Sequence, residues 1–283
     1  MLGWPEERDR LEKITGEKIS LDGLTGPSGD NSSEPQIDDS GRQATWLIAQ
    51  RQKGHRHSVD DVLTAWFALQ ICNDAPTSLD LGTGIGTVGL LTLWGLPSGA
   101  VLTCIEAQEI SHRLLEANID FNGLRPRVTS IHGDIRTHRF DRKFPLITGS
   151  PPYFPVGTGV VPRDTQKAHA RFELRGDVGD YAMAAAENLL NDGWFVFCFP
   201  WAQKDRALKA VANADLSAVR IMDVIPRASL TPLITLFACR HRSVSGGVPQ
   251  LDPPFIVRAV DGNFTLEMLG VRRGFGFQDA NDH

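Results

Sequence analysis

The stretch LDLGTGIGTVGL, residues 79–90, constrains the fold of this 283-residue chain more than any other. It joins an expected apolar strand, 78–81, to an apolar segment with the spacing of a helix. Glycines in such a turn permit positive φ angles and let a ligand lie against the backbone, while the amides at the helix start attract negative groups. The stretch therefore predicts a strand–turn–helix unit that binds a ligand at Gly82, Gly84 and Gly86.

Strand and helix patterns alternate along the rest of the chain. The run WFVFCF at 194–199 is apolar on both faces, which is typical of a central strand. The expected strands are 78–81, 100–105, 128–131, 144–147, 194–199, 219–225 and 233–239. The expected helices are 5–15, 60–72, 86–93, 110–122, 181–190 and 204–214. Such alternation predicts an α/β fold with a doubly wound, mostly parallel sheet, here of seven strands.

The net charge of −5 is unevenly distributed. Residues 1–41 hold ten acidic and four basic side chains, whereas the remaining residues hold 24 and 25. Residues 24–41 are rich in Gly, Ser, Pro and Asp and offer too little apolar surface to offset the entropy lost on ordering. We therefore expect an acidic, flexible N-terminal extension over 1–41 and a folded domain over 42–283.

Composition disfavours several kinds of site and location. No apolar run approaches the roughly 20 residues of a membrane helix, and the beginning of the chain, MLGWPEERDR, lacks a signal-peptide pattern. The four cysteines are not paired as CxxC, and His55 and His57 have no third ligand at the spacing of a metal site. We therefore expect a cytoplasmic protein without a membrane segment, a metal site or disulfides.

Acidic residues stand at or just after three of the expected strands. Asp80 would face a pyrophosphate poorly, but it suits a ligand with a cationic centre and an amino group. Glu106 can accept hydrogen bonds from both hydroxyls of a ribose, as acids at this place also do in NAD proteins. Asp134 is either a third ligand contact or a turn or helix-cap carboxylate. Residues 84–89 formally fit the dinucleotide pattern GxGxxG, yet Asp80 favours a different cofactor.

The segment SPPYF, residues 150–154, follows another expected strand. Pro151 and Pro152 make the backbone stiff and extended, so that the Ser150 oxygen and the Pro151 carbonyl would point in fixed directions. Acceptors that bind both N–H groups of an exocyclic amine draw its nitrogen towards a tetrahedral shape and expose its lone pair. We expect an exposed Tyr153 ring to stack on a planar base, and positioning to contribute more than a strong general base. Taken alone, the segment could also be an ordinary proline-rich loop.

The motif DLGTGIG resembles the first motif of class I S-adenosylmethionine-dependent methyltransferases. SPPYF resembles the (Asn/Asp/Ser)-Pro-Pro-(Tyr/Phe) signature of the enzymes that methylate amino groups. The stretches GHRHSVDDVLTAWFA, residues 54–68, and AHARFELRGDVGDY, residues 168–181, are similar to the bacterial tRNA(Val) adenine-N6-methyltransferases. The resemblance covers roughly residues 45–270. It implies a Rossmann-like class I domain that uses S-adenosyl-L-methionine to modify tRNA, most simply at adenine N6.

The resemblance also implies roles for individual residues. The implied catalytic residues are Ser150, Pro151, Pro152 and Tyr153. The implied cofactor contacts are Asp60, Asp80, Gly82, Gly84, Gly86, Glu106 and Asp134. The implied substrate contacts are Tyr153, Phe154, Lys167, Arg171 and Glu173. Asp60 could instead serve only to cap or balance the helix that begins there.

Two positions depart from the pattern of that family: Ser150 stands where Asn is usual, and Phe172 stands where His is usual. Because Ser-Pro-Pro also occurs in enzymes that methylate cytosine N4, the target base stays open. The alternatives are an amino group on an rRNA or DNA base or on a protein glutamine, or a non-catalytic RNA-binding or assembly protein that keeps the fold. An NAD dehydrogenase would explain neither Asp80 nor the two prolines.

Local clusters of basic residues favour RNA as the partner despite the negative net charge. The clusters are Arg51, Lys53 and Arg56, then Arg136, Arg139, Arg142 and Lys143, then Arg163, Lys167, Arg171 and Arg175. Each cluster could equally be ordinary solvated surface. The sequence leaves the oligomeric state open.

Overall fold

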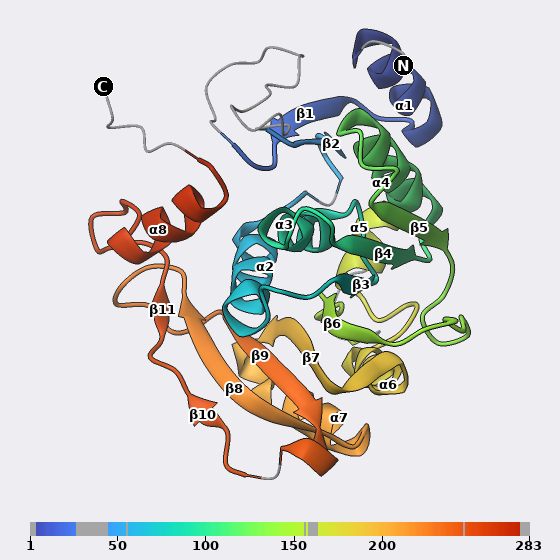
Figure 1. Cartoon of the computed structure of the whole chain (residues 1–283). Coiled ribbons are helices and arrows are strands. Elements are labelled where there is room, and N and C mark those ends of the chain that lie inside the picture. Colours follow the sequence, from blue (N-terminus) through green and yellow to red (C-terminus); the bar gives the residue numbers. More distant parts are fainter. Residues whose placement is uncertain are drawn as a thin grey trace.

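The computed structural model describes residues 4–26, 45–54, 56–155, 157, 164–245 and 247–277, and Figure 1 shows their arrangement. The strands are β1 (Ile19–Gly23), β2 (Leu47–Arg51), β3 (Thr77–Leu81), β4 (Val101–Glu106), β5 (Val128–His132), β6 (Phe144–Gly149), β7 (Leu189–Pro200), β8 (Leu216–Ile225), β9 (Ile234–His241), β10 (Gln250–Leu251) and β11 (Phe255–Ile256). The helices are α1 (Trp4–Thr15), α2 (Val59–Ile71), α3 (Thr87–Gly95), α4 (Glu109–Phe121), α5 (Thr165–Arg171), α6 (Val178–Asn188), α7 (Lys204–Asn213) and α8 (Leu266–Gly274), with short 3-10 turns η1 (Trp201–Gln203) and η2 (Arg242–Val244).

The central sheet has the strand order β10-β8-β9-β7-β6-β3-β4-β5, with β11 also beside β8. Strands β3 to β7 run parallel to one another, whereas β9 lies antiparallel between β7 and β8. This confirms the doubly wound, mostly parallel sheet and the central place of residues 194–199. The strand order reverses between β3 and β6, and ligands bind at the carboxyl ends of the strands at such a point.

Helices lie on both faces of the sheet (Figure 1), and their side chains belong to two hydrophobic clusters. One cluster gathers side chains of α2, α3, α4 and α8, and the other gathers side chains of α6 and α7. α7 turns an apolar stripe inward: Ala207 and Val211 are buried. The helices therefore hold the strand ends of the switch point in a fixed frame.

The structure differs from the sequence-based expectation at two places in the sheet. The sheet has nine strands rather than seven, because the two-residue segments β10 and β11 extend its edge beside β8. β7 begins at Leu189, so the last two residues of the helix expected at 181–190 lie inside a strand instead. At Gly193 an added Cβ would lie 3.0 Å from the Phe144 carbonyl oxygen, which shows how closely the two strands approach at the irregularity in their pairing.

The N-terminal segment also differs from the expectation. The helix expected at 5–15 is confirmed by α1, and β1 pairs antiparallel with β2. Leu11, Ile19 and Leu24 are buried in the same core as α2 and α3, and Trp4 packs edge-to-face on Phe121 of α4. Residues 4–26 are therefore part of the folded unit rather than a flexible extension. Most of the expected linker, residues 27–41, lies outside the described residues.

Candidate active site

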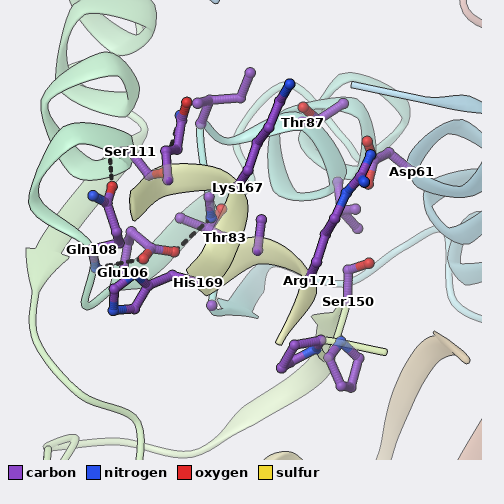
Figure 2. Close-up of a pocket in the computed structure, with 18 of the residues that line it drawn as sticks. Asp61, Thr83, Thr87, Glu106, Gln108, Ser111, Ser150, Lys167, His169 and Arg171 are labelled. Carbon is purple, nitrogen blue, oxygen red and sulfur yellow. Dashed lines mark hydrogen bonds between the residues drawn. The ribbon is translucent and has the colours of Figure 1, made fainter. Parts of the chain in front are cut away.

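A cavity of about 680 Å³ lies at the carboxyl ends of β3, β4 and β6 (Figure 2). Its volume is in the range of small-molecule sites. The wall on one side is the glycine turn after β3 with Glu106 from the end of β4, and the wall on another side is the corner from Ser150 to Phe154 after β6. Figure 2 shows Ser150, Glu106 and the α5 residue Lys167 around this one space.

The glycine turn needs glycine for two different physical reasons. Gly82, Gly84 and Gly86 have φ angles of 58°, 60° and 100°, in the left-handed region. A Cβ at Gly82 would collide with the Tyr181 hydroxyl, and one at Gly86 would lie 2.7 Å from a methyl carbon of Leu115. A Cβ at Gly84 would meet nothing within 4 Å, since this residue borders the cavity. Gly82 and Gly86 therefore permit packing, whereas Gly84 leaves open space for a ligand.

Asp80 lines the cavity but is committed to the fold. Its Oδ2 accepts hydrogen bonds from the Thr83 hydroxyl at 2.5 Å and the Gly89 amide at 3.0 Å, and its Oδ1 accepts one from the Thr148 hydroxyl at 2.7 Å. Burial raises the pKa of Asp80, and these bonds oppose that shift. The carboxylate thus ties the turn, α3 and β6 together, a role that the sequence did not suggest.

Glu106, the predicted ribose acceptor, ends β4 and lines the cavity. Its Oε2 accepts a hydrogen bond from the Gly84 amide at 2.8 Å, and its Oε1 accepts one from the Gln108 amide at 2.6 Å (Figure 2). Burial raises its pKa, while the two amides and the more distant Arg175 oppose the shift. Since each carboxylate oxygen can accept two hydrogen bonds, one lone pair on each oxygen stays available to a ligand.

The proline corner is held by the segment that follows α5. Pro151 and Pro152 have no N–H to donate, and the next two amides, of Tyr153 and Phe154, both donate to the Arg171 carbonyl, at 3.1 and 2.9 Å. The Gln203 side chain donates to the Tyr153 carbonyl at 2.8 Å. The corner is therefore fixed from two sides, as the two prolines predict.

The expectation of an exposed Tyr153 ring is wrong. The ring is half-buried, packs edge-to-face on Phe199, and its hydroxyl donates to Asp60 Oδ2 at 3.0 Å. Burial, with Cys198 and Asp60 nearby, raises the pKa of Tyr153 well above its usual value, so the hydroxyl keeps its proton. The exposed aromatic residue of the corner is Phe154, whose surface is 44% accessible.

Asp60 and Asp61 lie in the first turn of α2 and both line the cavity. Asp60 is bound by the Tyr153 hydroxyl, so it links α2 to the proline corner. Asp61 caps the helix, because its Oδ2 accepts the Ser58 amide hydrogen bond at 2.9 Å. Burial, together with the negative charge of Asp60, raises the pKa of Asp61 to about 7.

The titration of Asp61 predicts a falling stability with rising pH. The folded state keeps a proton that the unfolded state releases near pH 4, so between about pH 4 and 7 stability should fall by up to about 1.4 kcal/mol per pH unit. Asp61→Asn keeps an acceptor for Ser58 and should flatten this slope, which urea unfolding at a series of pH values would measure. An unchanged slope in the variant would contradict the assignment.

Helix α5 covers the cavity, and the sequence analysis missed it. Its N-cap Asp164 accepts a hydrogen bond from the Lys167 amide at 2.9 Å. The helix has only seven residues, too few for its sequence pattern to be distinguished from that of a loop. Arg51, with a side chain only 8% exposed, pairs with Asp164 at 2.6 Å and with Glu17 at 2.7 Å. The basic residue expected to meet phosphates is therefore buried, and it joins α5 to the N-terminal segment.

Arg51→Met should lower the free energy of unfolding by about 3 kcal/mol, because it leaves Glu17 and Asp164 without their buried cation. Arg56→Met is the matched control, since Arg56 pairs with Asp22 at the surface and its loss should cost at most about 1 kcal/mol. Denaturant unfolding measures both variants. Equal losses of unfolding free energy in the two variants would show that the burial of Arg51 does not strengthen its ion pairs.

The other predicted substrate residues fall into two groups. Phe154, Lys167 and Arg171 line the cavity, and no described acidic side chain forms an ion pair with Lys167 or Arg171. Glu173 does not line the cavity; it is largely buried and pairs with Arg206 at 2.5 Å. Phe172, which replaces the usual His, packs against the Phe154 ring with 5.6 Å between ring centroids.

Two of the predicted cofactor contacts, Asp134 and Gly86, do not line the cavity. Asp134 pairs with Arg136 at 2.6 Å and is not among the residues that line the cavity, although its neighbours Gly133 and Ile135 are. Gly86 also lies outside the lining and caps α3 instead. Cofactor contacts at Asp134 and Gly86 therefore stay predictions. Arg163 and His55 fall outside the described residues.

Within the described part of the chain, no group of three or more His, Cys, Asp or Glu side chains is placed to hold a metal ion. In the same part, no helix combines the length and apolar character needed to cross a membrane. All four cysteines are free thiols.

Curated relatives agree with the resemblance stated above. A tRNA1(Val) (adenine(37)-N6)-methyltransferase of Flavobacteriaceae bacterium (strain 3519-10) is 26% identical over 187 residues, which cover 66% of this chain and 78% of the relative. The enzyme of the same name from Histophilus somni (strain 2336) is 29% identical over 189 residues, covering 65% and 76%. No family model matches the chain.

Solved structures identify the fold. A predicted O-methyltransferase from Agrobacterium tumefaciens superposes with a TM-score of 0.58 at 17% identity, covering 78% of this chain and 99% of that one. Methanocaldococcus jannaschii Trm5, solved with adenosine, gives a TM-score of 0.50 at 13% identity, covering 69% and 53%. The predicted fold and resemblance are thus confirmed: the chain has the class I S-adenosylmethionine-dependent methyltransferase fold and resembles the tRNA1(Val) (adenine(37)-N6)-methyltransferases.

Proposed function

We propose that the protein transfers a methyl group from S-adenosyl-L-methionine to the N6 amino group of an adenine in tRNA. The observation that carries this proposal is that the glycine turn with Glu106 and the proline corner with Ser150 border the same cavity. The relatives named for this reaction support the choice of substrate. A tRNA substrate also favours a location in the cytoplasm.

The residues present fit the cofactor. Gly84 leaves open space beside the cavity, and Glu106 keeps a free lone pair on each oxygen there. Gly82, Gly84 and Glu106 are the residues that would hold the adenosyl part, and Asp60 also lines the cavity. When bound, the cofactor supplies an electrophilic methyl group on a sulfonium.

The proline corner would bind and orient the amine. Ser150 Oγ and the Pro151 carbonyl are the proposed acceptors for its two N–H groups, which turns the nitrogen lone pair towards the methyl donor. Because Tyr153 is fixed by its hydroxyl bond, its ring forms a rigid wall for a planar base, and the exposed Phe154 offers a second ring at the rim. The base would leave its stack to enter the cavity.

Lys167, Arg171 and Arg175 would hold the RNA backbone. Lys167 and Arg171 come from α5, which covers the cavity, and Arg175 follows it and also lines the cavity. Phosphate contacts of this kind make binding weaken steeply as salt concentration rises. A protein glutamine substrate would show little salt dependence, so this measurement separates the two substrate classes.

Incubation of the protein with labelled cofactor and total RNA from a strain lacking it, followed by nucleoside mass spectrometry, tests the proposal. Label in N6-methyladenosine of the tRNA fraction is the expected result. Label in N4-methylcytidine would move the target to cytosine. Cofactor binding without transfer to RNA would favour the non-catalytic interpretation.

A further inference from the structure

A series of polar contacts links Ser150 through the buried Cys198 to Tyr153 and Asp60, which also line the cavity. Ser150 Oγ lies 3.4 Å from Cys198 Sγ of β7, and this sulfur lies 3.3 Å from the Tyr153 hydroxyl oxygen. The Tyr153 hydroxyl donates in turn to Asp60 Oδ2 at 3.0 Å. The four side chains therefore join the ends of β6, β7 and α2 in one network.

The order of donors in this network follows from counting protons. The single Tyr153 proton is used on Asp60, so only the Cys198 S–H can supply the proton between sulfur and Tyr153. Thr64, also near this sulfur, already donates its proton to the Asp60 carbonyl at 2.7 Å. When the Cys198 proton points to the Tyr153 oxygen or to the Thr64 oxygen, the sulfur is left as an acceptor for the Ser150 hydroxyl.

Two further properties keep Cys198 in this role. Its side chain is fully buried. Burial, followed by the negative charge of Asp60, raises the pKa of Cys198 to about 11, so the thiol keeps its proton at neutral pH.

We propose that Cys198 is a positioning residue that turns the Ser150 proton inward, so that the Ser150 oxygen offers only lone pairs to the substrate amine. This inference rests on the proposed function. It accounts for serine at a position where the resemblance implies Asn. An amide oxygen is always an acceptor, whereas a hydroxyl can donate or accept and must be oriented to do one of them.

Cys198→Ala should slow methyl transfer about three- to tenfold, the effect of one lost hydrogen bond, at saturating cofactor and total RNA. Cofactor affinity, measured by calorimetry, should not change. Cys198→Ser can both donate and accept, and it should therefore be faster than Cys198→Ala. A role in packing alone predicts the reverse order, because an apolar core tolerates alanine better than a hydroxyl.

Cys239→Ala is the matched control: this thiol is also fully buried, on the adjacent strand β9, and no described side chain bonds its sulfur. It should leave the rate unchanged. Ser150→Ala combined with Cys198→Ala should be no slower than Ser150→Ala alone, since Cys198 acts only through Ser150. Circular dichroism of each variant verifies folding.

The possible failures can be told apart. If the wild type transfers methyl groups but Cys198→Ala is as fast as Cys239→Ala, or if the two substitutions in the double variant act additively, the inference about Cys198 is overturned and the proposed function stands. If the wild type transfers no methyl group to any RNA, both are overturned.

Discussion

Ser150→Ala is expected to lower the rate of methyl transfer about 100-fold, the effect seen when one preorganised polar group at a reacting centre is removed. The physical reason is that Ser150 borders the cavity on a corner fixed by two prolines, and no other side chain of that corner has an oxygen free to replace it. The Tyr153 hydroxyl is already committed to Asp60. Cofactor affinity should stay unchanged, because among the described residues no hydrogen bond joins Ser150 to Glu106 or to the glycine turn.

Single-turnover rates with labelled cofactor, together with calorimetric cofactor affinities, measure this effect. Ser217→Ala is the matched control, since Ser217 is also partly buried but lies on β8 outside the cavity lining. Equal losses of rate and cofactor affinity in Ser150→Ala would show that this residue does not align the amine.

Gly84→Ala should weaken cofactor binding at least about tenfold, or about 1.4 kcal/mol. The new methyl group would occupy space beside the cavity that is empty of protein atoms, close to the amide that donates to Glu106. The left-handed backbone at φ 60° adds strain of about 1–2 kcal/mol to the folded state itself.

Gly123→Ala separates these two effects. Gly123 has φ 63°, and a Cβ there would also meet nothing within 4 Å, but the residue lies in the turn after α4. Both variants should lose similar stability in thermal unfolding, while only Gly84→Ala should lose cofactor affinity in calorimetry. If Gly123→Ala weakened binding equally, the proposed cofactor place at Gly84 would be wrong.

The sequence predicted the parts of the fold that carry strong periodic or glycine signals. The β3–α3 unit was found from its glycines, and β7 from an apolar run typical of a central strand. The glycine turn and the proline corner were each expected just after a strand, and they border one cavity because the strand order reverses there.

The parts that the sequence missed depend on contacts between distant residues. Helix α5 has seven residues, too few for a periodic pattern, and it is held by Arg51 from 113 positions earlier in the chain. The orientation of Tyr153 depends on Asp60, 93 positions away, so its burial could not be seen in the segment SPPYF. α8 was missed because its apolar residues are few and only Met268 and Val271 are buried.

The double ion pair of Arg51 has a practical consequence for anyone who shortens this protein. Composition suggests trimming the chain at residue 42, yet that truncation would delete Glu17 and expose the hydrophobic surface that Leu11 and Ile19 cover. It would also leave Arg51, which holds α5 through Asp164, with one of its two acidic partners. A shortened enzyme should then be more easily cut by proteases at α5.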